Sequence, residues 1–188
     1  MATDWIKTAA VGAFGGNFVR AAYRFIYTCI SSVTFVIAYL LIKRLPDGIL
    51  VEIPGYFKIL FYLIQTFGAI IIILSFKDLG ILEFSGVSQI VKYISGKEIG
   101  GNIEGLTIGS LTRAGVYGII RHPLYAGGIL VFLFNPNVTV NSAIVSLLST
   151  IYVIIGAYIE DRRLKNIFGS QYDDYAKDIP SFIPKIFK

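Results

Sequence analysis

Long apolar runs divide the 188-residue chain, and they cover residues 23–42, 56–76, 116–134 and 141–159. A helix needs about 20 apolar residues to cross the hydrocarbon core, and inside it every backbone N–H and C=O group must find a partner within the protein. We therefore predict an all-α fold, a polytopic membrane helical bundle with four to five transmembrane helices. One domain over residues 1–188 is the natural size for such a bundle.

Composition supports this class and excludes some kinds of site. Hydrophobic residues make up 55% of the chain and charged residues 15%, against about 45–50% and about 25% in soluble domains. With one cysteine, Cys29, and one histidine, an intramolecular disulfide and a zinc or iron–sulfur site made only of such ligands are excluded. The net charge of +5 is better explained by membrane orientation than by a nucleic acid partner, and we expect no nucleic acid.

The segments between the runs carry turn and surface patterns. The sequence Pro46-Asp47-Gly48 follows the first run, and Asn135-Pro136-Asn137-Val138-Thr139 joins the last two, which predicts an antiparallel C-terminal helical hairpin. Between Lys77 and Gly115 we predict a surface segment with short helices, for example around Gly86 to Ile94.

The two ends of the chain are predicted to lie on the membrane surface. Residues 160–188 are amphipathic and basic, so we expect a helix on the membrane face that ends near Pro180. The first 18 residues fit either an interfacial helix or part of a broken span, and we favour the interfacial helix.

The distribution of basic residues predicts the orientation of the chain. With four spans, the N-terminal segment, residues 77–121 and the C-terminal tail share one side and hold 14 of the 17 Lys and Arg residues, because only Lys43, Arg44 and Lys58 lie opposite. Lys and Arg accumulate in cytoplasmic loops. We therefore expect a multi-pass protein of the cell membrane whose site faces the cytoplasm.

The candidate site is Arg121-His122-Pro123-Leu124-Tyr125, which contains the single histidine. Ionisable residues at membrane depth are costly, so a functional site is the default hypothesis, and a structural ion pair is the alternative. Proline suits the first turn of a helix, so a membrane helix can begin at Pro123. A helix over residues 124–134 is only about 17 Å long, which predicts a recess on the cytoplasmic side.

The hairpin predicts the depth of the acidic residues that follow the last run. If the turn centres near Asn137, antiparallel pairing places His122 level with Val153 and Glu160 level with Gly115, a vertical offset of roughly 10 Å. A ligand of nucleoside size fits such a gap. Glu160 continues an apolar helix face and can turn toward the recess, whereas Arg162 and Arg163 are interpreted as a solvated helix end.

These residues resemble a known signature. The pattern Tyr117-x-x-x-Arg121-His122-Pro123-x-Tyr125-x-Gly127, followed by Glu160-Asp161-x-x-Leu164 and Phe168-Gly169-x-x-Tyr172-x-x-Tyr175, is similar to the C-terminal signature of the integral-membrane methyltransferases, which include isoprenylcysteine carboxyl methyltransferases and phospholipid methyltransferases. The similarity is closer to the NnrU-like and methanethiol S-methyltransferase group, through Tyr23-Arg24-x-x-Tyr27, Asp78-Leu79 to Gln89 and the hairpin turn.

The resemblance implies S-adenosylmethionine as the cofactor, bound between the Arg-His-Pro segment and the Glu-Asp pair. It implies catalytic roles for Arg121, His122 and Glu160, with Arg121, Tyr23 and Gln89 on the substrate side. For Tyr23 an interfacial anchor is an equal alternative. The implied cofactor-binding residues are Tyr117, His122, Pro123, Leu124, Tyr125, Gly127, Glu160, Asp161 and Leu164.

The sequence also departs from the family pattern. A second glutamate often stands at the position of Asp161, which is one methylene shorter, so a contact of Asp161 with the cofactor is an open question. The N-terminal region lacks a His-Ser pair that related chains carry, and Thr28 stands where the group usually has asparagine.

Several functions stay open at this stage. We favour methylation of a small thiol such as methanethiol or sulfide, since transfer from a sulfonium to a thiolate neutralises charge and suits an apolar pocket. Arg121 favours a thiolate, and His122 suits proton transfer near neutral pH. Alternatives are phospholipid or isoprenylcysteine methylation, a heme-binding NnrU-like isomerase, and a non-enzymatic membrane protein with a structural or transport role. Membrane lipid is an expected partner in every case.

Overall fold

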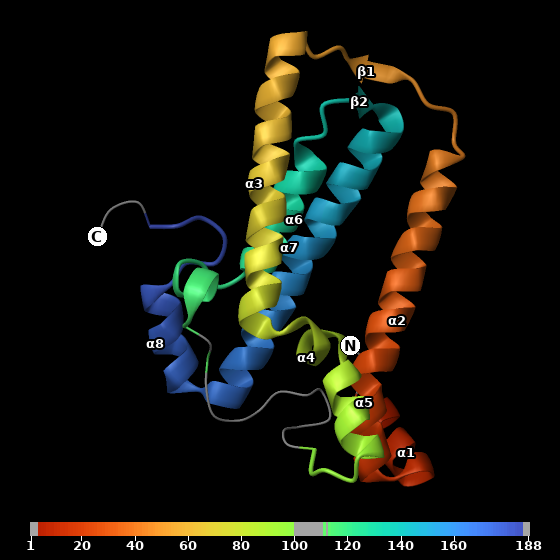
Figure 1. Cartoon of the computed structure of the whole chain (residues 1–188), viewed down its shortest axis with the longest axis vertical. Coiled ribbons are helices and arrows are strands. Elements are labelled where there is room, and N and C mark those ends of the chain that lie inside the picture. Colours follow the sequence, from red (N-terminus) through yellow and green to blue (C-terminus); the bar gives the residue numbers. More distant parts are fainter. Residues whose placement is uncertain (1–3, 100–110, 112, 186–188) are drawn as a thin grey trace. The chain divides into compact units, whose positions relative to one another are not determined.

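The computed structural model describes residues 4–99, 111 and 113–185, and almost all regular structure in them is helical (Figure 1). The helices are α1 (Asp4–Phe14), α2 (Gly16–Lys43), α3 (Gly55–Leu79), α4 (Ile81–Ser85), α5 (Val87–Ile94), the 3-10 helix η1 (Gly115–Gly118), α6 (Pro123–Leu133), α7 (Val140–Phe168) and α8 (Ser170–Asp178). Two short strands, β1 (Ile49–Val51) and β2 (Val138–Thr139), complete the elements. The predicted all-α class is confirmed.

Three of these helices are long and apolar enough to cross a membrane, namely α2, α3 and α7, with 28, 25 and 29 residues. Together with the apolar composition they make the chain an integral membrane protein. The described part of the chain has one shorter apolar helix, α6, which has 11 residues. At 1.5 Å per residue it is about 17 Å long, well below the roughly 30 Å of a bilayer core.

The predicted span over residues 116–134 is wrong as a continuous helix. The chain forms η1, leaves the helical conformation at His122 with φ −121° and ψ 58°, and begins α6 at Pro123. Proline disfavours a helical residue before it and supplies no N–H for a preceding turn. The alternative start at Pro123 is therefore confirmed.

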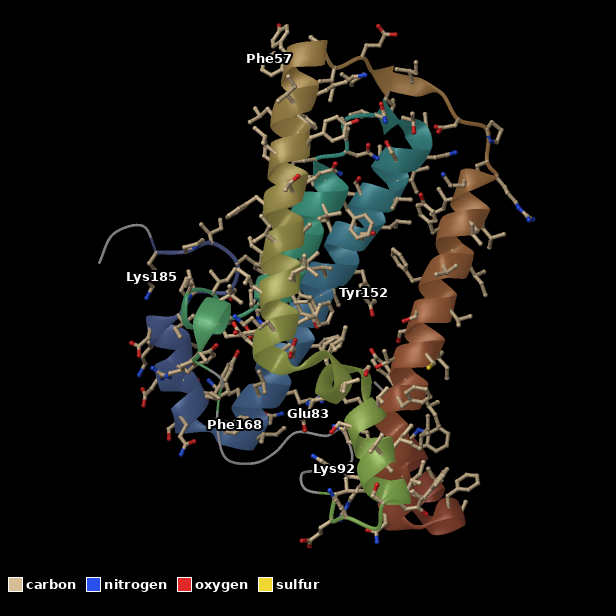
Figure 2. All side chains as sticks on the ribbon, in the orientation of Figure 1. Phe57, Glu83, Lys92, Tyr152, Phe168 and Lys185 are labelled. Carbon is tan, nitrogen blue, oxygen red and sulfur yellow. The ribbon has the colours of Figure 1, made fainter. Side chains whose placement is uncertain are left out.

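The predicted ends of the other helices also needed correction. α7 does not stop at residue 159 but continues to Phe168, because the charged residues after Glu160 are good helix formers. It ends at Gly169, which has a φ of +55°, and α8 follows as a separate helix. Figure 2 shows Phe168 at this junction. The predicted single helix from Glu160 toward Pro180 is therefore wrong.

The N-terminal region forms its own helix, α1, and Gly15 with a φ of +82° separates it from α2. α2 begins at Gly16, seven residues before the predicted start at residue 23. Whether α1 lies at a membrane interface stays a prediction. The predicted short helix around Gly86 to Ile94 is confirmed as α5.

The described chain divides into two compact units, which are considered separately. The first contains residues 4–37 and 79–99, and the second contains residues 38–78, 111 and 113–185. In the first unit Arg24 Nε donates to the Phe84 carbonyl at 2.8 Å. Gly86, with a φ of +85°, lies so close to the Phe25 backbone that a Cβ would come within 2.5 Å of its nitrogen. Close approach between α2 and the α4–α5 turn therefore requires glycine.

In the second unit α3, α6 and α7 lie side by side (Figure 1). α3 and α6 approach closely at two glycines, where a Cβ on Gly68 would lie 2.8 Å from the Gly127 carbonyl oxygen and one on Gly127 2.7 Å from the Gly68 oxygen. Small residues allow membrane helices to pack this closely. Side chains of the neighbouring helices donate hydrogen bonds to carbonyl groups in the last turn of α6. Gln65 of α3 donates to the Val131 carbonyl at 2.8 Å, and Ser146 of α7 donates to the Phe132 carbonyl at 2.6 Å.

The loop before α7 is hydrogen-bonded to the loop after α2. β1 and β2 pair antiparallel, with Ile49 opposite Thr139. Asp47 accepts a hydrogen bond from the backbone N–H of Asn141 at 3.0 Å, which caps the N-terminus of α7. This bond lowers the pKa of the Asp47 carboxyl. The two strands had no counterpart in the sequence predictions.

A polar cavity of about 380 Å³ lies between this capped end and the C-terminal end of α6. Its lining includes residues from α2, α3, α6, α7 and their loops, among them Lys43, Asp47, Gln65, Asn135 and Asn141.

Candidate functional site

Arg121 and His122 lie in the short non-helical segment between η1 and α6. Their backbone N–H groups donate to the carbonyls of Pro180 and Ser181, at 2.8 and 3.0 Å. The segment after α8 thus pairs with the backbone of the candidate site. Residues 59 positions apart in the sequence are held together by main-chain hydrogen bonds, which cannot be inferred from the local sequence.

Asp161 connects the charged side chains of the site. Its Oδ2 accepts a hydrogen bond from Arg121 Nη2 at 3.1 Å, and its Oδ1 lies 2.7 Å from Nε2 of His122. The Tyr172 hydroxyl also donates to Oδ1. Three side chains from two segments of the chain, the η1–α6 connection and α8, therefore converge on one carboxylate, which keeps its negative charge compensated.

His122 is enclosed by this arrangement, and its side chain is 3% exposed. The Tyr125 ring stacks on it with 5.6 Å between centroids, and the Phe182 ring is tilted against it at 5.7 Å. Its second ring nitrogen, Nδ1, lies 3.8 Å from Glu160 Oε2. That separation is too long for a hydrogen bond, so the Nδ1 edge faces a carboxylate without being bonded to it.

The predicted gap of roughly 10 Å between His122 and Glu160 does not separate their side chains, since His122 Nδ1 lies 3.8 Å from Glu160 Oε2. It assumed helical geometry through the hairpin, but residues 134–139 are not helical. Extended chain advances about 3.3 Å per residue, against 1.5 Å in a helix. The connection and the short α6 together therefore match the longer α7, and they bring His122 beside Glu160 and Asp161.

Arg121 is mostly buried, with 12% of its side chain exposed. Besides Asp161 it donates to the Ser181 hydroxyl, and its guanidinium lies over the Tyr172 ring at 5.7 Å. Its Nε is buried and has no hydrogen-bond partner within the described part of the chain. A buried donor without a partner is costly, so this atom is a candidate contact for a ligand acceptor.

η1 places Tyr117 beside the same site. Asp78 Oδ2 accepts a hydrogen bond from the Val116 N–H at 3.0 Å, and Gly115, with a φ of +54°, leaves room for that carboxylate. The Tyr117 hydroxyl is hydrogen-bonded to Ser75 of α3. Burial, and then the negative charge of Glu160, raise the pKa of Tyr117 well above its usual range.

α8 supports the site through an apolar cluster of Tyr172, Tyr175 and Ile179, against which Leu164 and Phe168 of α7 pack. The predicted cofactor residue Leu164 thus lies in this cluster. Burial, and then the hydrogen bond to Asp161, raise the pKa of Tyr172.

The remaining predicted residues divide between the two units. In the second unit, Pro123 is fully buried and Leu124 partly so, while Gly127 lies against α3. Tyr23 and Gln89 belong to the first unit, where Gln89 is 4% exposed. Their role on the substrate side stays a prediction.

Three residues that contact Arg121, His122 or Asp161 were not predicted as site residues from the sequence. Tyr172 stood within the quoted motif, and its spacing from Gly169 was a usable signal. Ser181 and Phe182 carried none, because their contacts with Arg121 and His122 depend on how the tail returns to the bundle.

Comparison with known proteins gives three informative likenesses. A methanethiol S-methyltransferase of Crocosphaera subtropica is 30% identical over 131 residues, which is 70% of this chain and 49% of that protein. Methanethiol S-methyltransferase 2 of Bradyrhizobium diazoefficiens is 26% identical over 167 residues, which is 89% of this chain and 61% of that protein. Protein-S-isoprenylcysteine O-methyltransferase B of Arabidopsis thaliana is 37% identical over 82 residues, covering 39% of each chain.

The chain spans 49% and 61% of the length of the two methanethiol S-methyltransferases. No family model matches it, and no solved structure matches it significantly. The NnrU-like part of the resemblance stays a prediction. By sequence, this chain is a relative of the membrane methyltransferase group that includes methanethiol S-methyltransferases and isoprenylcysteine O-methyltransferases.

Proposed function

We propose that the chain is an S-adenosylmethionine-dependent methyltransferase that methylates a small thiol such as methanethiol or sulfide. The observation that carries the proposal is the joining of Arg121, His122 and Asp161 beside Glu160, in a chain related to methanethiol S-methyltransferases. Of the residues that the resemblance marks as cofactor-binding, His122, Glu160 and Asp161 come together here.

The charges of the cluster suit a cationic ligand. Arg121 is neutralised by Asp161, at 3.1 Å, so Glu160, which is 41% exposed, adds a net negative charge beside His122. S-adenosylmethionine carries a sulfonium and an ammonium group, and when bound it supplies an electrophilic methyl group. A site with an uncompensated carboxylate favours such a cation.

The hydrogen-bonding groups also fit the cofactor. Glu160 and Nδ1 of His122 are two acceptors 3.8 Å apart, suited to an amine or hydroxyl donor. The buried Nε of Arg121 is a donor left for an acceptor group of the cofactor or the substrate. Because the Arg121 charge is paired, its contribution to a thiolate is a directed hydrogen bond more than a free positive charge.

The likeness to an isoprenylcysteine O-methyltransferase supports a second candidate, methylation of an isoprenylcysteine or phospholipid. A lipid substrate has to enter between membrane helices, whereas a small thiol does not. We place the thiol first because the longer likenesses are to methanethiol S-methyltransferases.

The proposal is tested by binding of S-adenosylmethionine to the detergent-purified chain, measured by isothermal titration calorimetry. We expect saturable binding, weakened at least about tenfold in His122→Ala and in Glu160→Ala, since each loses an acceptor worth about 1.4 kcal/mol or more. Arg162→Ala is the matched control, because Arg162 follows on the same helix and its guanidinium lies over the exposed Tyr158 ring, 5.3 Å away.

Radiolabelled methyl transfer to methanethiol, a prenylated cysteine and phosphatidylethanolamine then separates the substrate candidates. A folded, colourless parent protein that binds no S-adenosylmethionine contradicts the proposal and favours a structural or transport role. A visible absorption band of heme favours the isomerase alternative instead.

A further inference from the structure

The contacts of Asp161 determine which nitrogen of His122 carries the proton. An ionised carboxylate only accepts hydrogen bonds, and Arg121, at 3.1 Å from Oδ2, and the Tyr172 hydroxyl, on Oδ1, both donate to this one. The nitrogen 2.7 Å from Oδ1 must therefore donate as well. Neutral His122 consequently carries its hydrogen on Nε2 and presents a bare Nδ1.

Nδ1 then faces Glu160, and among the described residues no hydrogen-bond donor contacts it. Two aromatic rings pack against the imidazole, Tyr125 stacked on it and Phe182 tilted against it. The nearest carboxylate oxygen on the Nδ1 side, Glu160 Oε2, lies 3.8 Å away and is an acceptor like Nδ1 itself. Two acceptors that face each other without a protein donor between them are suited to share a donor from a ligand.

We propose that Asp161 is a positioning residue, not a contact of the cofactor: it holds His122 in the Nε2–H tautomer, so that Nδ1 and Glu160 together accept hydrogen bonds from the bound ligand. This inference rests on the proposed function for the identity of that ligand. It answers the open question about Asp161, because Arg121, His122 and Tyr172 already occupy both oxygens of its carboxylate.

The substitution Asp161→Asn tests the tautomer directly. Arg121 can only donate, so the amide oxygen of an asparagine is held toward Arg121, and its NH₂ group faces His122. His122 then has to accept at Nε2, which moves its hydrogen to Nδ1 and removes one of the two ligand acceptors. The corresponding aspartate-to-asparagine change in serine proteases costs about 10⁴-fold in kcat through the wrong histidine tautomer.

The chain is well suited to the measurement because it contains one histidine. The protein is labelled with ¹⁵N-histidine, and a long-range ¹H–¹⁵N spectrum is recorded in detergent at a pH where His122 is neutral. Because the chain has one histidine, the spectrum shows a single residue and needs no assignment. We expect Nε2–H in the parent and Nδ1–H in Asp161→Asn. The loss of one acceptor should weaken S-adenosylmethionine binding about tenfold, and methyl transfer should fall about 100-fold or more by analogy with that tautomer effect.

Two variants serve as controls. Asp161→Glu keeps a carboxylate and is expected to retain the Nε2–H tautomer and to recover binding. Tyr175→Phe removes a hydroxyl of the same apolar cluster, equally buried and bonded to the Tyr117 carbonyl at 3.2 Å, and is expected to leave the His122 spectrum unchanged.

The tautomer and the proposed function fail separately. An Nδ1–H parent, or an Asp161→Asn variant that keeps Nε2–H, overturns the inference whether or not the protein binds S-adenosylmethionine. A parent that shows Nε2–H and switches in Asp161→Asn but binds no S-adenosylmethionine upholds the role of Asp161 and contradicts the proposed cofactor.

Discussion

Asp161 and Tyr172 show how single side chains determine this site. Asp161 is one methylene shorter than the glutamate often found at its position in chains that it resembles, yet its carboxylate reaches both Arg121 and His122. It can do so because the Arg-His segment lies directly beside α7. The Tyr172 hydroxyl completes the set of donors from α8.

We predict that Tyr172→Phe lowers the free energy of unfolding at neutral pH by about 1.5–3 kcal/mol, the range for a hydrogen bond to a charged group. The raised pKa of Tyr172 means that this stabilisation is complete below the unfolded pKa of about 10 and is lost as the pH rises beyond it. The difference in thermal unfolding between parent and variant should therefore shrink above about pH 10. A constant difference from pH 8 to 11 would contradict the burial of this hydroxyl against Asp161.

Among the helices, the contact between α3 and α6 depends on two glycines. Gly68 and Gly127 bring the two backbones together, and the neighbouring Gly128 has no atom within 4 Å of where its Cβ would lie. The family resemblance implies that Gly127 contacts the cofactor. The structure provides a partner helix, and a cofactor contact by Gly127 stays a prediction.

We predict that Gly127→Ala destabilises the protein by about 1–3 kcal/mol, as overpacking of a tight contact does. Gly128→Ala is the matched control, expected to be neutral or stabilising by at most about 1 kcal/mol, since alanine is the better helix former. Thermal unfolding of both variants in the same detergent measures the difference. Equal midpoints would show that the α3–α6 contact is not as close as described.

The connectivity of the whole chain defines two sides of the membrane. The loop after α2 pairs with the loop before α7 through β1 and β2, so both lie at one end of the second unit. His122 lies at the opposite, N-terminal end of α6, as the residue before its first turn. By the positive-inside rule the end with Arg121, His122 and α8 faces the cytoplasm, which is the orientation we propose.

Orientation can be tested with single-cysteine variants in a Cys29→Ala background. We predict that Glu52→Cys, in an exposed loop position, reacts with a membrane-impermeant maleimide in intact cells. Lys177→Cys, at a side chain 74% exposed in α8, should react only after permeabilisation. The reverse labelling pattern would contradict the cytoplasmic site.

Local physical chemistry was sufficient for much of this protein. In a bilayer, an apolar run of about 20 residues can pair its own backbone N–H and C=O groups only as a helix, so the sequence alone predicted a helical membrane protein. Pro123 cannot continue a preceding helix, which determined where α6 begins, and the turn residues located the connections. The charged motif residues were recognisable as a candidate site because such groups are costly beside apolar spans.

The contacts of the site side chains and the relative positions of His122 and Glu160 depended on tertiary structure. Helix ends such as the extension of α7 to Phe168 were missed because hydropathy marks where a helix leaves the apolar region, not where its hydrogen bonding stops. Helical geometry placed Glu160 about 10 Å from the level of His122, whereas in the folded chain, with its non-helical connection at residues 134–139, the two side chains lie 3.8 Å apart. Only the folded chain could therefore assign Asp161 to His122 and bring Tyr172, Ser181 and Phe182 to the site, because these contacts depend on path lengths summed over several elements rather than on any one of them.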